Sequence, residues 1–366
     1  MNSEAVKKPA KTPLLVVSKR DALPLGKRIL IRAAALVFAI VICALIILIV
    51  GKANPFLVFA AMFRGFFINI LPSVYSVSIL LGISLAVTPA FRMKFWNIGA
   101  EGQALVGALT TAIIMIVLGG KLPDPVVTVI MLVGAVAAGM LWGVIPAVFK
   151  AQWRTNETLF TLMMNYIAIE GVNLLLEICG GPSHVVGRSL LANGRLPSLF
   201  NEPYIIPIVV ALILAVVMFF YLRQSKQGYE ISVVGESENT AKYIGINVKK
   251  VIIRTMAISG AICGLIGFLI VGGVDYGITT TTIGGRGFTA IMVSWLSKFN
   301  PFIMILTSFM IVFLEKGANS AASKFSLIDA NFSNVLIGII LFFLIGCEFF
   351  LEYRVQLGKT SKEVQK

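Results

Sequence analysis

A short polar stretch between two long apolar segments carries the residues best suited to chemistry. Asn97, Glu101 and Gln103 supply two amides and a carboxylate, and Gly99 and Gly102 stand among them. Polar side chains at membrane depth are costly and commonly functional, and glycine permits a bend or a close backbone approach. The apolar residues that follow predict a helix whose free N–H groups point back at this cluster. The pattern predicts a broken helix that meets a polar solute. The alternative is a helix start at the cytoplasmic surface, capped by Asn97.

The composition indicates a membrane protein. The 366 residues are 58% hydrophobic and 13% charged, and the mean hydropathy is +0.92. A soluble core of this length cannot bury so much apolar surface. We therefore predict an all-α polytopic membrane protein. The formal net charge of +14 comes from basic residues near the ends of apolar segments. This placement indicates membrane topology and argues against a nucleic-acid partner.

Several kinds of chemistry are not expected from this sequence. The four cysteines are scattered without a C-x-x-C pair, and His184 is the one histidine. From these residues we expect no metal site, no disulfide framework and no histidine catalysis. The sequence has no G-x-x-x-x-G-K-[ST] phosphate loop, so any ATP hydrolysis is expected on another chain. We expect no cofactor, and no constellation of nucleophile and base supports a membrane-embedded enzyme.

Hydropathy divides the chain into about ten transmembrane segments. We expect residues 1–28 to be a disordered basic cytoplasmic tail, residues 29–350 to form the transmembrane domain and residues 351–366 to be a second cytoplasmic tail. The segments are expected near residues 29–50, 69–91, 95–118, 126–149, 156–178, 204–222, 252–271, 288–296, 301–313 and 334–350. A short interfacial helix is expected at residues 54–67.

The order of the segments indicates an internal repeat. Five segments precede the external loop at residues 180–203 and five follow it, so the two halves have opposite orientations. A second irregular stretch, residues 275–287, is rich in threonine and glycine, and the apolar run after it is too short to span a bilayer. The broken third segment and the short eighth are counterparts in a 5+5 inverted-topology repeat with both termini in the cytoplasm.

Two further regions are polar where function is expected. The segment at residues 156–178 contains Asn165 and Glu170, which predict either a solute contact or a polar face that bonds to other helices. The basic loop at residues 223–250 contains Ser237 as a helix cap and Gly245 as a left-handed terminator. These signals predict a two-turn helix at residues 238–244 that docks into a soluble partner. The alternative is an ordinary positively charged cytoplasmic loop.

Four motifs resemble those of a known family. Residues 96–103, Trp-Asn-Ile-Gly-Ala-Glu-Gly-Gln, resemble the N-I-G-x-E-G-Q signature of bacterial ABC importer permeases of the ribose and branched-chain amino acid type. Residues 235–247 resemble the coupling loop of that family, residues 259–267 its small-residue helix and residues 287–291 a further family pattern. The resemblance covers about residues 70–350, although Glu238 stands where asparagine or proline is more usual. The G-A-E-G-Q form is similar to one of the two unlike permease subunits of nucleoside importers.

The resemblance implies a multi-pass permease in the bacterial plasma (inner) membrane. It would translocate nucleosides delivered by an external binding lipoprotein, paired as a heterodimer with a second related permease and with two ATP-binding subunits. Residues expected to couple to the ATPase are Glu236, Glu238, Asn239, Thr240, Ala241, Lys242, Tyr243 and Gly245. Residues expected in the translocation pathway are Asn97, Glu101, Gln103, Asn165 and Phe288. Residues expected to dock the receptor are Arg188, Arg195 and Arg286.

Two other functions remain open at this point. The same machine could carry ribose, galactose or another simple sugar. In a different class, an ion-coupled secondary transporter would bind a proton or sodium ion at Glu101, Glu170 or Asp275. That class has no use for the expected cytoplasmic helix, and it predicts uptake without an ATPase.

Overall fold

The computed structural model describes residues 15–19, 24–49, 52–180, 186–187, 190–325 and 330–357. Seven helices in these ranges are long and apolar enough to cross a membrane, which confirms an all-α polytopic membrane protein. Arg188 and His184 lie outside the described residues. The chain divides into two compact units, Phe66–Phe313 and a smaller unit made of Met1–Gly65 with Leu314–Lys366.

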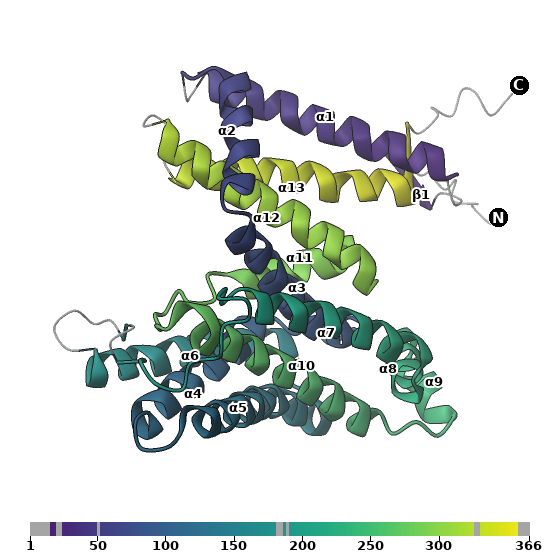
Figure 1. Ribbon diagram of the computed structural model, residues 1–366. Coiled ribbons are helices and arrows are strands. Elements are labelled where there is room, and N and C mark those ends of the chain that lie inside the picture. The colour runs from purple at the N-terminus through teal and green to yellow at the C-terminus, as the bar shows by residue number, and fades with distance from the viewer. Residues whose placement is uncertain are drawn as a thin grey trace, which may run out of the picture. The chain divides into compact units, whose positions relative to one another are not determined.

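The larger unit contains most of the helices (Figure 1). They are α3 (Ile70–Arg92), α4 (Ala100–Leu118), α5 (Asp124–Trp153), α6 (Glu157–Cys179), α7 (Ile205–Gln224), α8 (Lys226–Glu236), α9 (Glu238–Tyr243), α10 (Val248–Ile270), the π-helix η2 (Val271–Asp275) and α11 (Arg286–Leu296). The helices α2 (Pro55–Ile68) and α12 (Pro301–Lys324) each contribute residues to both units.

Small residues let α10 pack closely against α4 and α5. A side-chain carbon added to Gly260 would overlap the carbonyl oxygen of Gly139 on α5, and one added to Gly264 would overlap that of Ala135. In the contact with α4, a carbon added to Gly107 would lie 2.5 Å from the Cα of Gly264. Helices in lipid associate through such close backbone approach, because lipid tails are as apolar as leucine. Figure 1 shows α5 and α10 running side by side.

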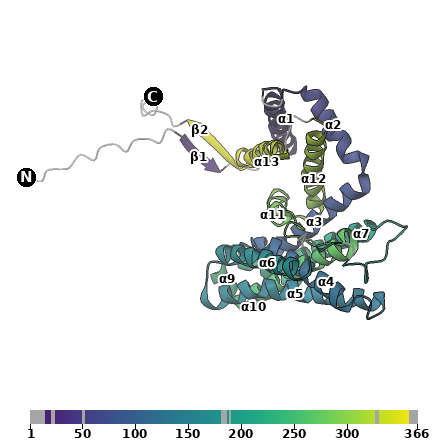
Figure 2. The same ribbon diagram turned by 90° about the vertical axis from the view of Figure 1, so that its left-hand side faces the viewer.

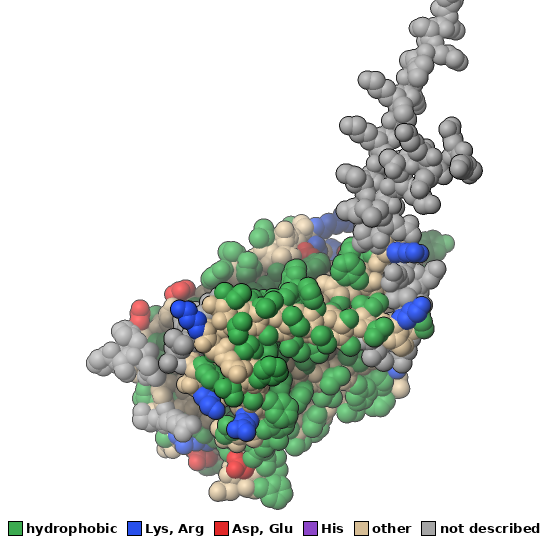
Figure 3. Space-filling model, turned by 90° about the horizontal axis from the view of Figure 1, so that it is seen from above, with side chains coloured by type: hydrophobic (Ala, Val, Ile, Leu, Met, Phe, Trp, Pro, Cys, Tyr) green, Lys and Arg blue, Asp and Glu red, His purple; other side chains and the backbone are tan. Residues whose placement is uncertain are grey.

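The helices of this unit differ in how much apolar surface they leave for lipid. In α3, 78% of the most apolar window is buried inside the protein, whereas the corresponding share for α5 is 22%. The helix α3 is therefore central, and α5 presents a wide apolar face to its surroundings. Figure 3 shows that many hydrophobic side chains are exposed on the face that it draws. This distribution is typical of a membrane protein.

The smaller unit contains two long helices and a pair of strands. The helices α1 (Leu25–Ile49) and α13 (Ala330–Glu352) pack together, with an edge-to-face contact of 5.1 Å between the rings of Phe38 and Phe343. The strands β1 (Leu15–Lys19) and β2 (Tyr353–Leu357) pair antiparallel, with Leu15 opposite Leu357 (Figure 2). Neither strand was expected from the sequence.

Several elements differ from the sequence-based expectations. The basic loop contains a second helix, α8, in addition to the expected α9, and α12 continues to Lys324 instead of ending near residue 313. A π-helix, Val271–Asp275, extends α10 up to the start of the irregular stretch expected at residues 275–287. The short eighth segment is confirmed, because α11 has 11 residues. At 1.5 Å per residue this is about 16 Å, which is half a bilayer core.

Candidate translocation and coupling sites

The polar stretch that precedes α4 is non-helical, and Phe95, Asn97 and Gly99 within it are buried. Lys94 adopts a left-handed conformation with φ of 60°, and α4 begins at Ala100. Asn97 is fully buried, and its Oδ1 accepts the Gly99 N–H at 3.0 Å. Its Nδ2 donates to the Ser259 hydroxyl of α10 at 3.2 Å. Asn97 therefore turns the chain into α4 and ties the turn to α10.

The amide of Asn165 on α6 holds the same stretch from the other side. Its Oδ1 accepts the Gly102 N–H at 2.8 Å, and its Nδ2 donates to the Ile98 carbonyl at 3.0 Å. Gly102 lies in the first turn of α4, where backbone N–H groups have no partner within the helix. Asn165 satisfies one of them, and the Thr161 hydroxyl accepts the Ile98 N–H at 3.2 Å.

The carboxylate of Glu101 joins the two irregular stretches of the chain. Its Oε1 accepts the Gly285 N–H at 2.8 Å, and its Oε2 accepts the Gly287 N–H at 2.6 Å. These groups begin α11, where a negative charge is favourable to the helix dipole. A side-chain carbon added to Gly287 would lie 2.5 Å from the Glu101 nitrogen, so glycine is needed for the contact.

The structure thus brings four of the five expected pathway residues together. Asn97, Glu101, Gln103 and Asn165 are buried and bond to one another, to backbone groups or to Ser259. Their first role is to fix the broken helices, because these bonds point into the protein. Phe288 lies next to Gly287 on α11, and its side chain is 44% exposed, unlike those of the other four.

Two tryptophans that the sequence analysis did not assign to the pathway stack at this site. The rings of Trp96 and Trp295 lie 5.7 Å apart at 24°, and each side chain is nearly half exposed. The edge of Phe91 contacts Trp96 at 5.8 Å between ring centroids. Trp295 follows Phe288 by seven residues, which places both on one face of α11. This spacing was the signal in the sequence that places Trp295 on the face of Phe288, whereas the stack with Trp96 depends on tertiary packing.

The expected cytoplasmic helix is present with its expected caps. The Ser237 hydroxyl accepts the Thr240 N–H at 3.2 Å at the start of α9, and Gly245 ends the turn with φ of +85°. Most of the expected coupling residues are exposed, and Tyr243 is 92% exposed. Ala241 is fully buried and faces inward. Ala241 therefore anchors the helix, and its neighbours form the outward surface.

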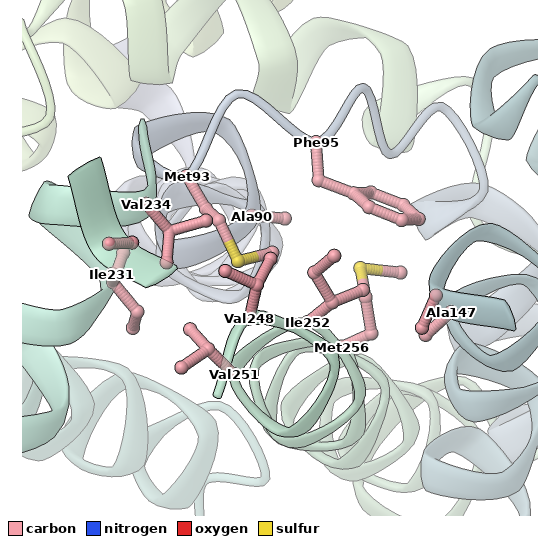
Figure 4. Packing of buried hydrophobic residues seen from close by; sticks show 12 residues of the cluster. Ala90, Met93, Phe95, Ala147, Ile231, Val234, Val248, Val251, Ile252 and Met256 are labelled. Atoms are coloured by element: carbon pink, nitrogen blue, oxygen red, sulfur yellow. The ribbon is translucent and has the colours of Figure 1, made fainter. Parts of the chain in front are cut away.

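A hydrophobic cluster connects Ala241 of α9 to the residues at the start of the polar stretch (Figure 4). Ala241 shares this cluster with Met93 and Phe95, which lie four and two residues before Asn97, and with residues of α5, α8 and α10. A side-chain carbon on Gly235 of α8 would overlap the Arg92 carbonyl oxygen, so the approach is close. Arg254 on α10 also forms a 2.8 Å ion pair with Glu230 on α8. The helices α8 and α9 are thus packed against the residues that precede the broken helix.

Arg195, one of the residues expected to dock a receptor, makes contacts within the chain. The Arg195 Nε donates to the Leu191 carbonyl at 3.0 Å, and its guanidinium lies 4.4 Å from the centroid of the Tyr276 ring. Arg286 is the first residue of α11 and is partly exposed. Arg195 therefore holds the loop before α7 against the loop after η2.

The carboxylates of the ion-coupled alternative have different surroundings. The Glu101 charge is met by two peptide N–H groups, as described above. Glu170 is exposed on α6, and its Oε2 accepts an N–H of Asn173 at 3.1 Å. In the part of the chain that the structure describes, no group of three or more His, Cys, Asp or Glu side chains is arranged to hold a metal ion.

The fold and the site define an integral multi-pass membrane protein whose broken helices are joined at a buried polar centre, which is the architecture of a solute permease. Residues 69–345 match the family model described as "Branched-chain amino acid transport system / permease component". The chain belongs to this family of transport permeases.

Curated relatives support the assignment. The chain is 32% identical to the guanosine ABC transporter permease protein NupP of Bacillus subtilis, over 76% of this chain and 80% of the relative. It is 25% identical to the nucleoside ABC transporter permease protein NupB of Lactococcus lactis, over 92% of this chain and 95% of the relative. It is 27% identical to a glucose ABC transporter permease protein of Haloferax volcanii, over 75% of each chain.

Proposed function

We propose that this chain is a membrane-spanning subunit of an ATP-driven ABC importer that translocates nucleosides. Its membership of the permease family and its similarity to guanosine and nucleoside permeases support this proposal. The observation that carries the ATP-driven part is α9, an exposed, capped helix packed against the residues that precede the broken helix. A glucose permease among the relatives keeps a simple sugar as the second candidate.

The assembly would contain four further subunits. The relatives include two guanosine permeases of one organism, NupP and NupQ, which supports a heterodimer with a second related permease. Two ATP-binding subunits would supply hydrolysis, since this sequence lacks a phosphate loop. An external binding lipoprotein would deliver the solute to Arg286 and to the loops near Arg188 and Arg195.

We infer a topology of ten segments with both termini in the cytoplasm of a bacterial cell. To the seven long helices it adds α1, α13 and the short α11. The basic residues that flank the apolar segments support this orientation. The contact of Glu101 with the start of α11 supports a 5+5 inverted repeat, since it joins the two segments expected to be counterparts.

The inferred mechanism transmits motion from α9 to the polar centre. ATP binding draws the ATP-binding subunits together and moves the exposed surface of α9, including Glu238 and Tyr243. Ala241 passes this motion to Met93 and Phe95 through the cluster of Figure 4. Asn97, Glu101 and the start of α11 that Glu101 binds then shift together, and the pathway beside Phe288 changes its opening. ATP acts by favouring one of two conformations.

Competition for uptake tests the solute class. Cells that express this chain with its partner subunits take up labelled guanosine in the presence of unlabelled adenosine, ribose, glucose or leucine. We expect adenosine to compete and the sugars and leucine to have no effect. Competition by glucose or ribose together with uptake of the labelled sugar would move the assignment to the sugar importer.

A further inference from the structure

Three tyrosines, Tyr75, Tyr204 and Tyr276, gather where α3 and α7 begin and η2 ends. The rings of Tyr75 and Tyr204 lie 5.6 Å apart at 52°. Tyr276 directly follows η2, and its hydroxyl donates to the Gly273 carbonyl at 2.9 Å. A side-chain carbon added to Gly273 would lie 3.8 Å from Pro207, so η2 packs against the first turn of α7. We call these three residues the tyrosine cluster, and the inferred topology places it on the external side.

The hydroxyl of Tyr75 is buried without a partner. Tyr75 is 6% exposed, and in the part of the chain that the structure describes its hydroxyl has no hydrogen-bond partner. Buried polar groups in native proteins are nearly always hydrogen-bonded, because leaving one unpaired costs the free energy of its desolvation. An unpaired hydroxyl at the entrance of a solute pathway indicates a partner that arrives and leaves.

The groups around Tyr75 suit a solute that has both a ring and polar substituents. The charges of Asp275 and Arg286 act on the Tyr75 hydroxyl, as do the phenols of Tyr204 and Tyr276. Asp275 is exposed and the other three are partly exposed, so they lie nearer to the surface than Tyr75 does. They form a rim that offers aromatic faces together with a carboxylate and a guanidinium.

The backbone that carries part of this rim has an unusual conformation. The π-helix η2 is a rare form that occurs frequently at functional sites. Tyr276 adopts a left-handed conformation with φ of 49°, which is uncommon for a residue other than glycine. Such a conformation persists where neighbouring contacts hold it, and the Arg195 guanidinium lies 4.4 Å from the centroid of the Tyr276 ring. The Tyr276 ring is thus fixed in the rim.

Arg286 connects the rim to the buried polar centre. It stands between Gly285 and Gly287, whose N–H groups donate to Glu101. Its charge acts on both Glu101 and Tyr75. The tyrosine cluster therefore lies beside the start of α11, the helix that carries Phe288.

We propose that the tyrosine cluster is an external entry site for the solute, in which the Tyr75 hydroxyl forms a hydrogen bond with a nucleoside and the rings contact its base. A nucleoside carries both kinds of group that the site can meet, a flat base and polar groups that pair with a phenol. Tyr75 is closed off in this structure and is reached when the external end opens. This inference rests on the proposed function and adds to it a site outside the pathway residues named above.

The test measures binding of labelled guanosine and the melting temperature for the full chain purified with its partner permease and ATP-binding subunits. Tyr75→Phe removes only the hydroxyl oxygen. We expect guanosine to bind about three- to tenfold more weakly, because one hydrogen bond is lost. We expect the melting temperature to equal or exceed that of the wild type, because no bond within the protein is lost. Tyr166→Phe, at an exposed position on α6, is the control and should change neither quantity.

Unchanged guanosine binding by Tyr75→Phe would overturn the inference, and a lower melting temperature with unchanged binding would assign the hydroxyl a structural role instead. If Tyr75→Phe does not fold, Tyr204→Leu removes a partly exposed ring from the rim and should weaken binding by a similar factor. Unchanged binding by that variant would also overturn the inference.

A separate outcome bears on the proposed function. Wild-type protein that binds glucose and not guanosine would contradict the nucleoside assignment. Tyr75→Phe measured with labelled glucose then tests the site by itself. Weaker glucose binding would support an entry site at Tyr75, and equal binding would overturn it.

Discussion

The Glu101 carboxylate of α4 binds the start of α11. It accepts hydrogen bonds from the N–H groups of Gly285 at 2.8 Å and Gly287 at 2.6 Å. These residues are 184 and 186 positions from Glu101 in the chain. The contact joins α4, which follows the broken stretch, to the short helix α11. It therefore makes the polar centre one unit, whose parts must move together.

Replacing Glu101 with alanine should disrupt this centre. Two backbone N–H groups would lose a charged acceptor, and a hydrogen bond to a charged group contributes about 1.5–3 kcal/mol. We expect a lower melting temperature in detergent and loss of uptake at equal expression. Glu101→Gln keeps one acceptor oxygen, so we expect its melting temperature and uptake to lie between those of the wild type and Glu101→Ala. The matched control is Glu170→Ala, which removes an exposed carboxylate. A Glu101→Ala protein that melts and transports like the wild type would show that the contact has no such role.

Gly287, which donates to Glu101, offers an independent test of this contact. Gly287→Ala adds a carbon 2.5 Å from the Glu101 nitrogen, and overpacking of this kind costs about 1–3 kcal/mol. We expect a lower melting temperature and reduced uptake. Gly338→Ala on α13 is the control, because nothing lies within 4 Å of its added carbon. Equal melting temperatures for the two variants would mean that α11 shifts freely away from α4.

Coupling through α9 predicts a defect without a loss of stability. Tyr243 is 92% exposed, so Tyr243→Ala should leave the melting temperature of the isolated chain unchanged. In the assembled transporter we expect a several-fold fall in uptake and in solute-stimulated ATP hydrolysis. Tyr229→Ala on α8, also exposed, is the control. Normal ATP hydrolysis and uptake in the Tyr243 variant would place the coupling surface elsewhere.

The exposed aromatic face of α11 predicts a defect in solute passage. Aromatic rings stack on flat, apolar faces such as that of a purine, with about 0.5–1.5 kcal/mol per contact. We expect Phe288→Ala to reduce guanosine uptake several-fold and to leave the melting temperature within a degree or two of the wild type. Phe220→Ala removes a similarly exposed ring from α7 and should have no effect. A defect of the same size in both variants would indicate a general effect of lost apolar surface.

Local signals in the sequence were sufficient to predict α9, the broken helix and the short α11. Ser237 and Gly245 predicted the bounds of α9, because helix caps depend on residues a few positions apart. The polarity of Asn97 and Glu101 likewise marked the broken helix. The short α11 followed from the length of its apolar run.

Contacts between distant segments had no signal in a single sequence. The pairing of Glu101 with Gly287 and the stack of Trp96 on Trp295 depend on tertiary packing. The helix α8 was missed because Gly228 and Gly235 within it have low helix propensity. Both glycines are needed for close backbone approach, since an added carbon would overlap a carbonyl oxygen of Leu222 or Arg92. Packing has overridden local preference there.

The most direct test of the central claim is labelled guanosine uptake by cells that express this chain with its partners. One arm carries a Lys→Ala change in the phosphate loop of the ATP-binding subunit, and another carries an ionophore that collapses ion gradients while cellular ATP is maintained. We predict that uptake is lost with the ATPase variant and persists with the ionophore. Uptake that survives the ATPase variant and collapses with the ion gradient would contradict the importer account and favour Glu101 or Glu170 as an ion site.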